Sequence, residues 1–271
     1  MRPIDSMRPI SLDELVARAP LLTRLDRKYI LPIVDLPSVL GGLAGVVRVL
    51  EIDGRRDFGY QSRYFDTPQL HSYLGAAYRR RRRFKVRIRS YAETDLHFLE
   101  VKTRGPRGST VKHRFAHDAG AHEERHFALS GPSRGQIDTV LDGARISVDW
   151  PLLPALTTRY RRTTLFVPAT GSRVTIDTGL HWVRPDGSAV RIRNSAIVET
   201  KSDQSVSDVD RLLWSLRHRP CSVSKYGTGL AALRPDLPAN HWRPVLRRYF
   251  VTEQTPSHLV EGRNSQEGAP S

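Results

Sequence analysis

The sequence is poor in cysteine, in long hydrophobic runs and in acidic residues, and each shortage narrows what the protein can be. Its single cysteine, Cys221, excludes an intrachain disulfide, so a reduced, cytoplasmic setting is expected. No stretch is apolar for long enough to span a bilayer, and the N-terminus lacks the apolar core of a signal peptide. Apolar residues make up 39% of the 271-residue chain, which predicts a folded protein with loose ends.

The shortage of acidic residues leaves the chain strongly basic. Lysine and arginine number 43 against 28 aspartates and glutamates, for a net charge of +15. Such a protein attracts polyanions, a class that includes nucleic acids, phosphorylated metabolites and anionic lipids. Arginine dominates over lysine, and its guanidinium forms forked contacts with phosphate. GC-rich coding produces the same arginine bias, so composition alone does not choose among these ligands.

The chain divides into three parts. Residues 1–19 read as a leader, loose over the first ten residues, followed by a short helix in SLDELVARAP. Ser11 suits the N-cap of that helix because Glu14 follows three residues later. Residues 20–250 contain the strand pattern and are expected to form one domain. Residues 251–271 are polar and are expected to be disordered.

Strand-like alternation fills most of the central part, at 46–116 and again at 154–202. The loops PATGS and RPDGS carry the residues that tight hairpin turns need. Helical patterns occur at 120–145 and in SVSDVDRLLWSLRHRP, which has an apolar stripe at helical spacing. Many antiparallel strands at short spacing predict an α+β protein built on a β-barrel or sandwich, with a few helices packed outside.

Charged residues share one face of strand after strand. In KVRIRSY, Lys85, Arg87 and Arg89 point one way because side chains two apart on a strand lie on the same side. LHFLEVKTR, TVKHRF, RVTIDTG and AIVETKS repeat the alternation, and several of them place an acid and a base together. For one strand alone the ordinary interpretation is a face wetted by solvent. The clustering of cations on several strands instead favours a face that points inward.

An inward charged face has a chemical use. A barrel of about eight strands has an interior that can hold a ligand. A row of unpaired cations inside it is costly, and a polyanion that fills the interior removes that cost. Carboxylates on the same face would pair neighbouring cations and hold a divalent metal on phosphate oxygens.

The motifs RLDRKY, RYFDT, KVRIRSY, FLEVKTR, VKHR, RYRRTTL, RVTIDTGL, VETKS and SVSKYGTG occur in this order over residues 20–232. As a set they resemble the VTC domain, the catalytic domain of polyphosphate polymerases in the CYTH-like superfamily of triphosphate tunnel metalloenzymes. The resemblance implies a mainly antiparallel β-barrel tunnel that binds ATP and a growing polyphosphate chain. The Glu-x-Glu-x-Lys signature of the superfamily's triphosphatase and cyclase branch is missing. Arg24, Asp26 and Lys28 occupy the comparable strand, which favours holding a long anion over hydrolysing a short one.

The same resemblance assigns the site. Glu199 falls where the family places its metal-binding glutamate, and Mn²⁺ or Mg²⁺ is the expected ion. Tyr226 positions its neighbouring lysine, packs near the nucleotide or packs in the core. RYRR leaves open whether Arg161 or Arg162 points inward. The implied catalytic cations are Lys28, Arg87, Arg89, Lys102, Arg161, Arg173 and Lys225; further binding residues are Lys112, Lys201 and Tyr226; further metal ligands are Glu100 and Asp177.

The function implied by the resemblance is a metal-dependent, ATP-dependent polyphosphate polymerase. Two alternatives stay open, a tunnel triphosphatase and a non-catalytic module that binds polyphosphate or nucleotide. Nucleic acid is disfavoured as a partner because no set of stacking aromatic residues accompanies the cations. The run YRRRRRF at 78–84 is an outer basic patch, a solvated loop or a guide that steers ATP toward the tunnel mouth.

Overall fold

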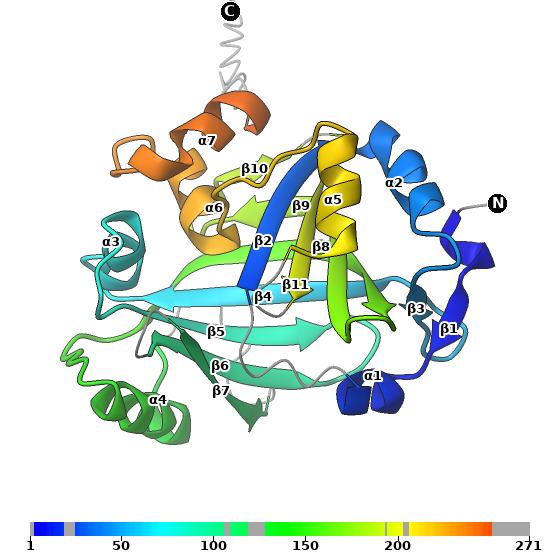
Figure 1. Ribbon diagram of the computed structural model, residues 1–271. Coiled ribbons are helices and arrows are strands. Elements are labelled where there is room, and N and C mark those ends of the chain that lie inside the picture. The colour runs from blue at the N-terminus through cyan, green and yellow to red at the C-terminus, as the bar shows by residue number, and fades with distance from the viewer. Residues whose placement is uncertain are drawn as a thin grey trace, which may run out of the picture.

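A curled antiparallel sheet forms the centre of the computed structural model (Figure 1). The structure describes residues 3–18, 25–105, 109–118, 128–192, 194–202 and 206–250. Arg24, predicted on the first strand of the site, and the predicted tail lie outside these residues. Along the path of hydrogen-bonded neighbours the strands are β2 (Leu25–Pro32), β11 (Ser195–Ser202), β9 (Ser172–Val183), β8 (Leu153–Val167), β4 (Phe58–Asp66), β5 (Phe84–Tyr91), β6 (His97–Arg104) and β7 (Thr110–His117).

Shorter elements surround this path. The remaining strands are β1 (Arg8–Ile10), β3 (Arg48–Leu50) and β10 (Ala189–Arg191). None of the helices in the described part of the chain has the length and apolar character needed to cross a bilayer. The helices are α1 (Leu12–Arg18), α2 (Leu36–Gly42), α3 (His71–Ala77), α4 (Gly131–Gly143), α5 (Asp208–Ser215), α6 (Lys225–Leu233) and α7 (Arg243–Tyr249), with 3-10 turns η1 (Pro3–Ser6), η2 (Ile33–Asp35) and η5 (Asn240–Trp242).

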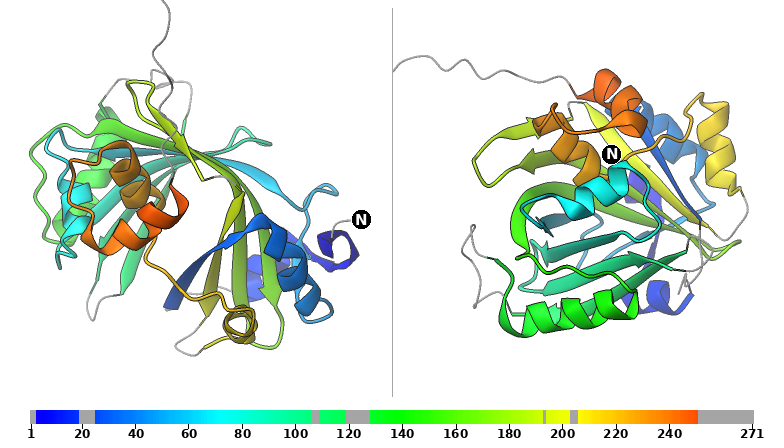
Figure 2. Two further views of the ribbon diagram at one scale, coloured as in Figure 1. Left: turned by 90° about the horizontal axis from the view of Figure 1, so that it is seen from above. Right: turned by 90° about the vertical axis from the view of Figure 1, so that its left-hand side faces the viewer.

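The sheet curls into a tunnel-like shape without closing through hydrogen bonds. Its two outermost strands on the path, β2 and β7, have no backbone pairing with each other in the residues that the structure describes. Register shifts at Tyr64/Phe65 on β4 and between Arg159 and Arg161 on β8 bend the sheet in its middle. Seen from the α3 end, the strands wrap around a common interior (Figure 2). The predicted antiparallel β tunnel with outer helices is therefore confirmed, as a curled sheet rather than a fully hydrogen-bonded barrel.

The aliphatic faces of the strands point outward, toward helices. Val86 of β5 and Leu99 of β6 are buried in one cluster with Ile137 of α4. On the other side, Val198 of β11 packs in a cluster with Leu213 of α5 and with residues of α2. Because neighbouring residues on a strand alternate between faces, the charged neighbours of these aliphatic residues point into the curl. This is the orientation that the charged alternation predicted.

One part of the interior is filled by α6, which packs with α3 and α7 (Figure 1). A β-carbon added at Gly227 or Gly229 would lie 2.2 Å from Trp242 or Trp182, so only glycine permits this close approach. Ser224 caps the helix by accepting a hydrogen bond from the Gly227 amide at 3.1 Å. The cap and the two glycines fix the start of α6 against the sheet.

Residues 3–10 are ordered structure rather than a loose leader. Ile4, Met7 and Ile10 are buried, and β1 pairs in parallel with β3. Three apolar residues spaced three apart are too few to reveal a strand from sequence, and tertiary burial decides the outcome. The predicted cap of α1 is confirmed, because the hydroxyl of Ser11 accepts from the amide of Glu14 at 3.2 Å.

Candidate functional site

The strand register brings charged residues from the whole sheet onto its concave side. Lys85 on β5 lies opposite Lys102 on β6, which lies opposite Lys112 on β7. Across the sheet, Glu199 on β11 lies opposite Lys28 on β2. We call the inward set the charged interior; it consists of Lys28, Lys85, Arg87, Arg89, Glu100, Lys102, Lys112, Arg162, Asp177, Glu199, Lys201 and Lys225.

Glu100 is held by three cations on the β5–β7 wall. Arg87 donates from Nε at 2.8 Å and from Nη2 at 2.5 Å to Oε2, and Lys112 Nζ lies 2.7 Å from Oε1. The guanidinium of Arg89 is 3.8 Å from the same carboxylate. Burial opposes ionisation of Glu100, but Arg87, Arg89 and Lys112 outweigh it and hold its pKa below the usual range. Glu100 is therefore an ionised counter-ion for this wall.

Asp177 is a second buried counter-ion, at the centre of the sheet. Arg162 on β8 binds it with two hydrogen bonds, of 2.6 and 2.8 Å, and Lys225 Nζ donates to Oδ2 at 2.5 Å. Burial raises the pKa of Asp177, but Arg162 and Lys225 lower it to about 2. Lys225 begins α6, so the docking of that helix places a cation in the interior.

Glu199 completes the set of carboxylates. Its Oε1 lies 3.0 Å from Lys201 Nζ and 3.6 Å from Lys28 Nζ. Burial again raises the pKa of Glu199, and Lys201 and Lys28 lower it further than burial raises it. Lys201 also donates to Thr175 at 3.2 Å. Each of the three interior carboxylates is thus ionised and paired with at least two cations.

A divalent metal fits beside Glu199 but not between all three predicted ligands. Asp177 is the diagonal neighbour of Glu199, because it pairs with Ile197 on the adjacent strand. Glu100 lies on β6, on the other wall, and no group of three metal-ligating side chains occurs in the described ranges. Mg²⁺ is commonly held by one or two carboxylates together with substrate phosphates. Glu199 would therefore hold such an ion together with a bound phosphate. Both oxygens of Asp177 already accept hydrogen bonds from Arg162 and Lys225, and the structure does not bring Glu100 to Glu199.

Arg161, a predicted site residue, lies outside the charged interior. Its side chain is 53% exposed and binds Asp57 at 2.5 Å on the opposite face of β8. The register shift next to Tyr160 decides which arginine of RYRR points inward, and that residue is Arg162. Strand alternation alone could not locate this bulge, which is why the sequence left the choice between the two arginines open.

Two other predicted residues stand apart from the charged interior: Arg173 lies at its margin, opposite Lys201, and Tyr226 lies in the core. The guanidinium of Arg173 donates to the carbonyl of Leu15 in α1 at 2.8 Å, at the end of the sheet away from α3. Tyr226 is 1% exposed, and its hydroxyl donates to Asp66 at 2.5 Å. Of its three open interpretations, the burial of Tyr226 supports packing in the core.

Lysine is confined to this site. All six lysines of the sequence belong to the charged interior. Lys85 donates to Ser224 at 3.2 Å, and neither Lys85 nor Lys102 pairs with a carboxylate of the described residues. Burial, with Arg87 and Lys28 nearby, lowers the pKa of Lys85 to about 7, and burial with Arg87 lowers that of Lys102. Lys85 was absent from the predicted site although it shares the face of Arg87.

An aromatic cluster lies at the end of the interior where β5 finishes. Tyr60 stacks on Tyr160 with centroids 5.4 Å apart and contacts Tyr91 at 5.0 Å. Arg114 lies 3.5 Å from the ring centroid of Phe98. This aromatic end, formed by Tyr60, Tyr91, Phe98 and Tyr160, was not expected from the sequence, although Tyr91 shares the parity of Arg87 and Arg89.

Solved structures with a similar fold come from bacteria, archaea and plants. A candidate adenylate cyclase from Bacillus halodurans is 14% identical, with 74% of this chain and 93% of that chain covered and a TM-score of 0.48. A protein from Pyrococcus horikoshii OT3 is 11% identical, covering 78% and 98% with a TM-score of 0.44. A candidate adenylyl cyclase from Hippeastrum, described as having a dominant triphosphatase activity, is 16% identical, covering 81% and 100% with a TM-score of 0.44. None is similar enough to bear on function.

No curated protein matches the sequence. The family model of the VTC domain does match it, over residues 23–234 of the 271. The match begins just before β2 and ends just after α6, so it contains every residue of the charged interior. The chain therefore belongs to the VTC domain family.

Proposed function

We propose that the protein is an ATP-dependent polyphosphate polymerase, which transfers the γ-phosphoryl group of ATP to the end of a polyphosphate chain held in the charged interior. The observation that carries the proposal is the imbalance of charge there. Nine cations share the interior with three carboxylates, and each carboxylate is already paired. Arg89 Nε is buried without a hydrogen-bond partner among the described residues. A chain of phosphates supplies the missing negative charge and acceptors.

Phosphoryl transfer requires positioning and charge neutralisation more than covalent chemistry. Arg87, Arg89 and Lys225 would hold the transferring phosphoryl group between the β5–β6 wall and the start of α6. The bond from the γ-phosphorus to the ADP oxygen breaks while a terminal chain oxygen bonds to that phosphorus, so ADP leaves and no proton is abstracted. Mn²⁺ or Mg²⁺ held by Glu199 would neutralise charge on the phosphate oxygens.

Hydrolysis with a carboxylate as the base is less supported than phosphoryl transfer to a chain. Activation of water needs a group that accepts its proton, with a pKa near the working pH. The pKa values of Glu100, Asp177 and Glu199 are all held low by neighbouring cations. Such carboxylates are weak bases. The carboxylates of the charged interior thus favour an acceptor that is already an anion, as the end of a polyphosphate chain is. The interior groups with a pKa suited to accepting a proton from water are Lys85, at about 7, and Lys201, at about 8.

The test is incubation of the purified protein with ATP and Mn²⁺ or Mg²⁺, followed by gel separation of polyphosphate and assay of ADP and orthophosphate. Polymer with ADP supports the proposal. Orthophosphate without polymer identifies a triphosphatase instead, and binding of polyphosphate without turnover identifies a binding module. Either of the last two results overturns the polymerase assignment.

Variants connect the activity to the site. Glu199→Ala is expected to abolish metal-dependent turnover, and Arg87→Ala is expected to reduce it strongly with the fold retained. Arg159→Ala is a matched control, because Arg159 is an exposed arginine of β8 whose Nε bonds Gln61 at 2.8 Å. Near-normal polymer yield from both site variants would rule out this location.

A further inference from the structure

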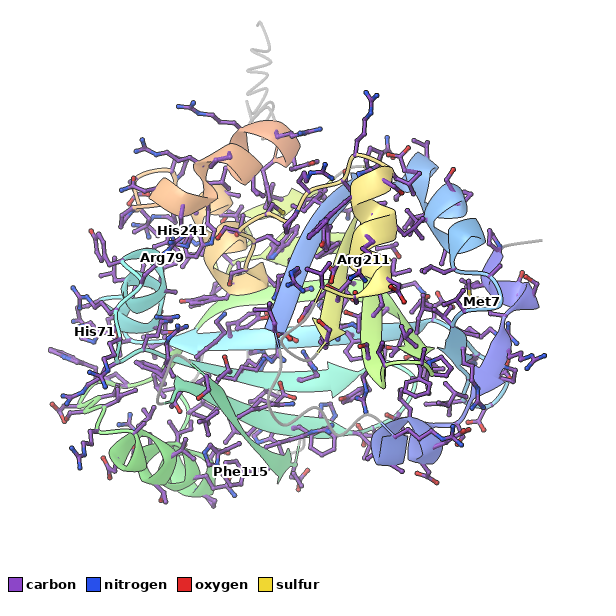
Figure 3. The ribbon with its side chains drawn as sticks, in the orientation of Figure 1. Met7, His71, Arg79, Phe115, Arg211 and His241 are labelled. Atoms are coloured by element: carbon purple, nitrogen blue, oxygen red, sulfur yellow. The ribbon has the colours of Figure 1, made fainter. Side chains whose placement is uncertain are left out.

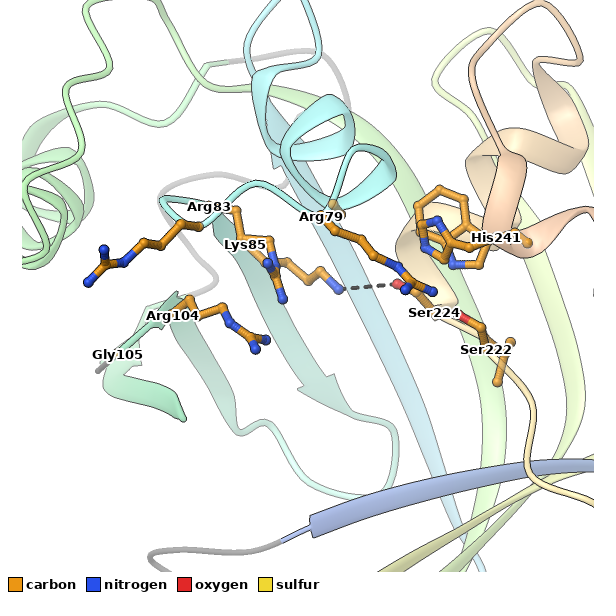
Figure 4. Close-up of a pocket in the computed structure, with 12 residues that line it drawn as sticks. Arg79, Arg83, Lys85, Arg104, Gly105, Ser222, Ser224 and His241 are labelled. Carbon is orange, nitrogen blue, oxygen red and sulfur yellow. Dashed lines mark hydrogen bonds between the residues drawn. The ribbon is translucent and has the colours of Figure 1, made fainter. Parts of the chain in front are cut away.

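A strongly cationic cavity opens at the α3 end of the molecule (Figure 4). It has a volume of about 850 Å³, and no carboxylate is among its lining residues in the described part of the chain. The loop after α3, the end of β6, the start of α6 and η5 all contribute to it. We call it the basic pocket, and its charged and titratable lining consists of Arg79, Arg81, Arg83, Lys85, Arg104 and His241.

The basic pocket continues the charged interior. Lys85 belongs to both, since it lines the pocket and lies opposite Lys102 on β6. Its Nζ reaches across to the hydroxyl of Ser224 at 3.2 Å, at the N-cap of α6 (Figure 4). Lys225, the next residue, bonds Asp177 in the centre of the site. A ligand that leaves the interior past Lys85 therefore enters the pocket.

The pocket holds positive charge that the protein does not balance. Arg79, Arg81 and Arg104 are exposed, and none of the three forms an ion pair with a carboxylate of the described residues. Burial, then the nearby guanidiniums of Arg104 and Arg79, lowers the pKa of Arg83. Burial and Arg79 likewise lower the pKa of His241. Crowding of like charges destabilises the protein unless an anion occupies the pocket.

The backbone at Arg79 is also unusual. Arg79 directly follows the C-cap of α3 with φ of 53°, a left-handed conformation in which glycine is the usual residue. A residue with a side chain costs about 1 kcal/mol there relative to glycine. The side chain reaches toward His241, and the two residues lie together at one end of the molecule (Figure 3). The strained position thus carries an arginine that lines the pocket, rather than the glycine that would relieve the strain.

We propose that the basic pocket binds a segment of linear inorganic polyphosphate outside the charged interior, so that the protein holds a long chain at more phosphates than the interior alone can contact. The inference rests on the proposed function for the identity of the anion. In this proposal the arginine run at 79–83 is a docking site for the polyphosphate chain. It is then neither a merely solvated loop nor a guide for ATP.

The pocket suits a phosphate chain better than a nucleotide or a nucleic acid. Bases bind by stacking on open aromatic faces. The tryptophan of the pocket, Trp242, is 2% exposed and packs in the core. The aromatic end lies at the other end of β5, where Tyr91 closes the strand that begins beside Lys85. A base would find its stacking partners there, whereas the lining of the pocket includes four arginines and Lys85, which suit contacts to phosphate.

The test compares binding of tripolyphosphate and of long-chain polyphosphate to the wild type and to the triple variant Arg79→Gly, Arg81→Ser and Arg104→Ser. Glycine at position 79 relieves the strained backbone, so this variant is expected to melt no lower than the wild type. Long-chain affinity is expected to fall at least about tenfold with a weaker salt dependence, because fewer counterions are released. Tripolyphosphate affinity is expected to stay unchanged, because the charged interior is intact.

A control of equal charge change is Arg8→Ser, Arg55→Ser and Arg211→Ser, three exposed arginines outside both sites; Arg211 is on α5 (Figure 3). Equal affinity for long-chain polyphosphate in the two triple variants would overturn the proposal that the basic pocket binds the chain, and would leave the proposed function in place. Failure of the wild type to bind tripolyphosphate or long-chain polyphosphate would overturn both the proposed function and the role of the basic pocket. Tighter binding of a single-stranded oligonucleotide than of long-chain polyphosphate, lost in the pocket variant, would identify a nucleic-acid site instead.

Discussion

Arg161 and Arg162 are adjacent in sequence and face opposite sides of β8, which makes them a matched pair. Arg162 binds buried Asp177, whereas Arg161 binds Asp57 at the surface. Hydrogen bonds between charged groups are worth about 1.5–3 kcal/mol, so Arg162→Gln is expected to lower turnover about 10- to 100-fold. Arg161→Gln is expected to leave it within about twofold, since exposed ion pairs contribute little. Steady-state polymer synthesis from ATP measures both.

Equal losses of turnover in Arg161→Gln and Arg162→Gln would contradict the register of β8. So would a loss from Arg161→Gln alone. Thermal melting of both proteins separates an effect on the fold from one on turnover, because Arg162→Gln leaves Asp177 with Lys225 as its remaining cation.

Lys85 makes anion binding depend on pH. Burial and the neighbouring cations lower its pKa to about 7 in the free protein. Above that pH the amine is mostly neutral, and a bound polyanion raises its pKa again, so binding takes up a proton. Tripolyphosphate affinity is therefore expected to fall as the pH rises above about 7, by up to about tenfold per pH unit for each proton taken up. Calorimetry in buffers of different ionisation enthalpy measures the proton uptake.

Lys85→Arg serves as the control for titration of the ligand itself. Arginine stays charged over the whole pH range. The number of protons taken up when tripolyphosphate binds at pH 8 is therefore expected to be smaller in Lys85→Arg than in the wild type, by up to about one proton. An unchanged uptake in Lys85→Arg would show that Lys85 is not the titrating group.

At the scale of single elements, α6 connects the fold to the site. Gly229 lies against buried Trp182, whose indole nitrogen donates to the carbonyl of Lys225 at 2.7 Å. Alanine normally stabilises a helix interior, but a β-carbon here would meet the indole at 2.2 Å. Gly229→Ala is expected to destabilise the protein by at least about 2 kcal/mol and to weaken tripolyphosphate binding, since α6 carries Lys225. Urea denaturation and calorimetry measure the two effects.

Gly135→Ala in α4 is the matched control. Gly135 is exposed, and its added β-carbon would meet nothing within 4 Å. This variant is expected to gain about 0.5–1 kcal/mol and to bind tripolyphosphate as the wild type does. A Gly229→Ala protein as stable as Gly135→Ala would show that α6 is not packed closely against Trp182.

The elements also show what the sequence could and could not predict. Strict alternation of charged and aliphatic residues was enough to orient β5, β6, β9 and β11, because one face had to meet helices. It failed on β8, where a bulge beside Tyr160 changes the parity. It also missed the burial of residues 3–10, which depends on partners far along the chain. The basic pocket could not be foreseen, since it joins a loop near residue 80 to η5 near residue 241.

At the scale of the whole molecule, the division between the two basic residue types is informative. Arginines occur over the whole surface, whereas the six lysines all belong to the charged interior. Lysine is a compact charge on a flexible stem, which suits contact with a phosphate chain that must move past it. The net charge of +15 is therefore distributed unevenly by residue type, with every lysine in the charged interior.

This distribution predicts that one anion protects every lysine side chain from an amine-specific acylating reagent. With tripolyphosphate at about ten times its Kd, roughly nine-tenths of the protein is occupied, so acylation of the lysines is expected to slow about tenfold. Lys85 is expected to react readily without ligand, because a pKa of about 7 leaves much of its amine neutral at that pH. Peptide mass spectrometry measures each site, with sulfate at equal ionic strength as the control. Unchanged acylation of Lys102 and Lys225 under saturating tripolyphosphate would mean that these lysines do not share an anion, and the charged interior would lose its proposed role.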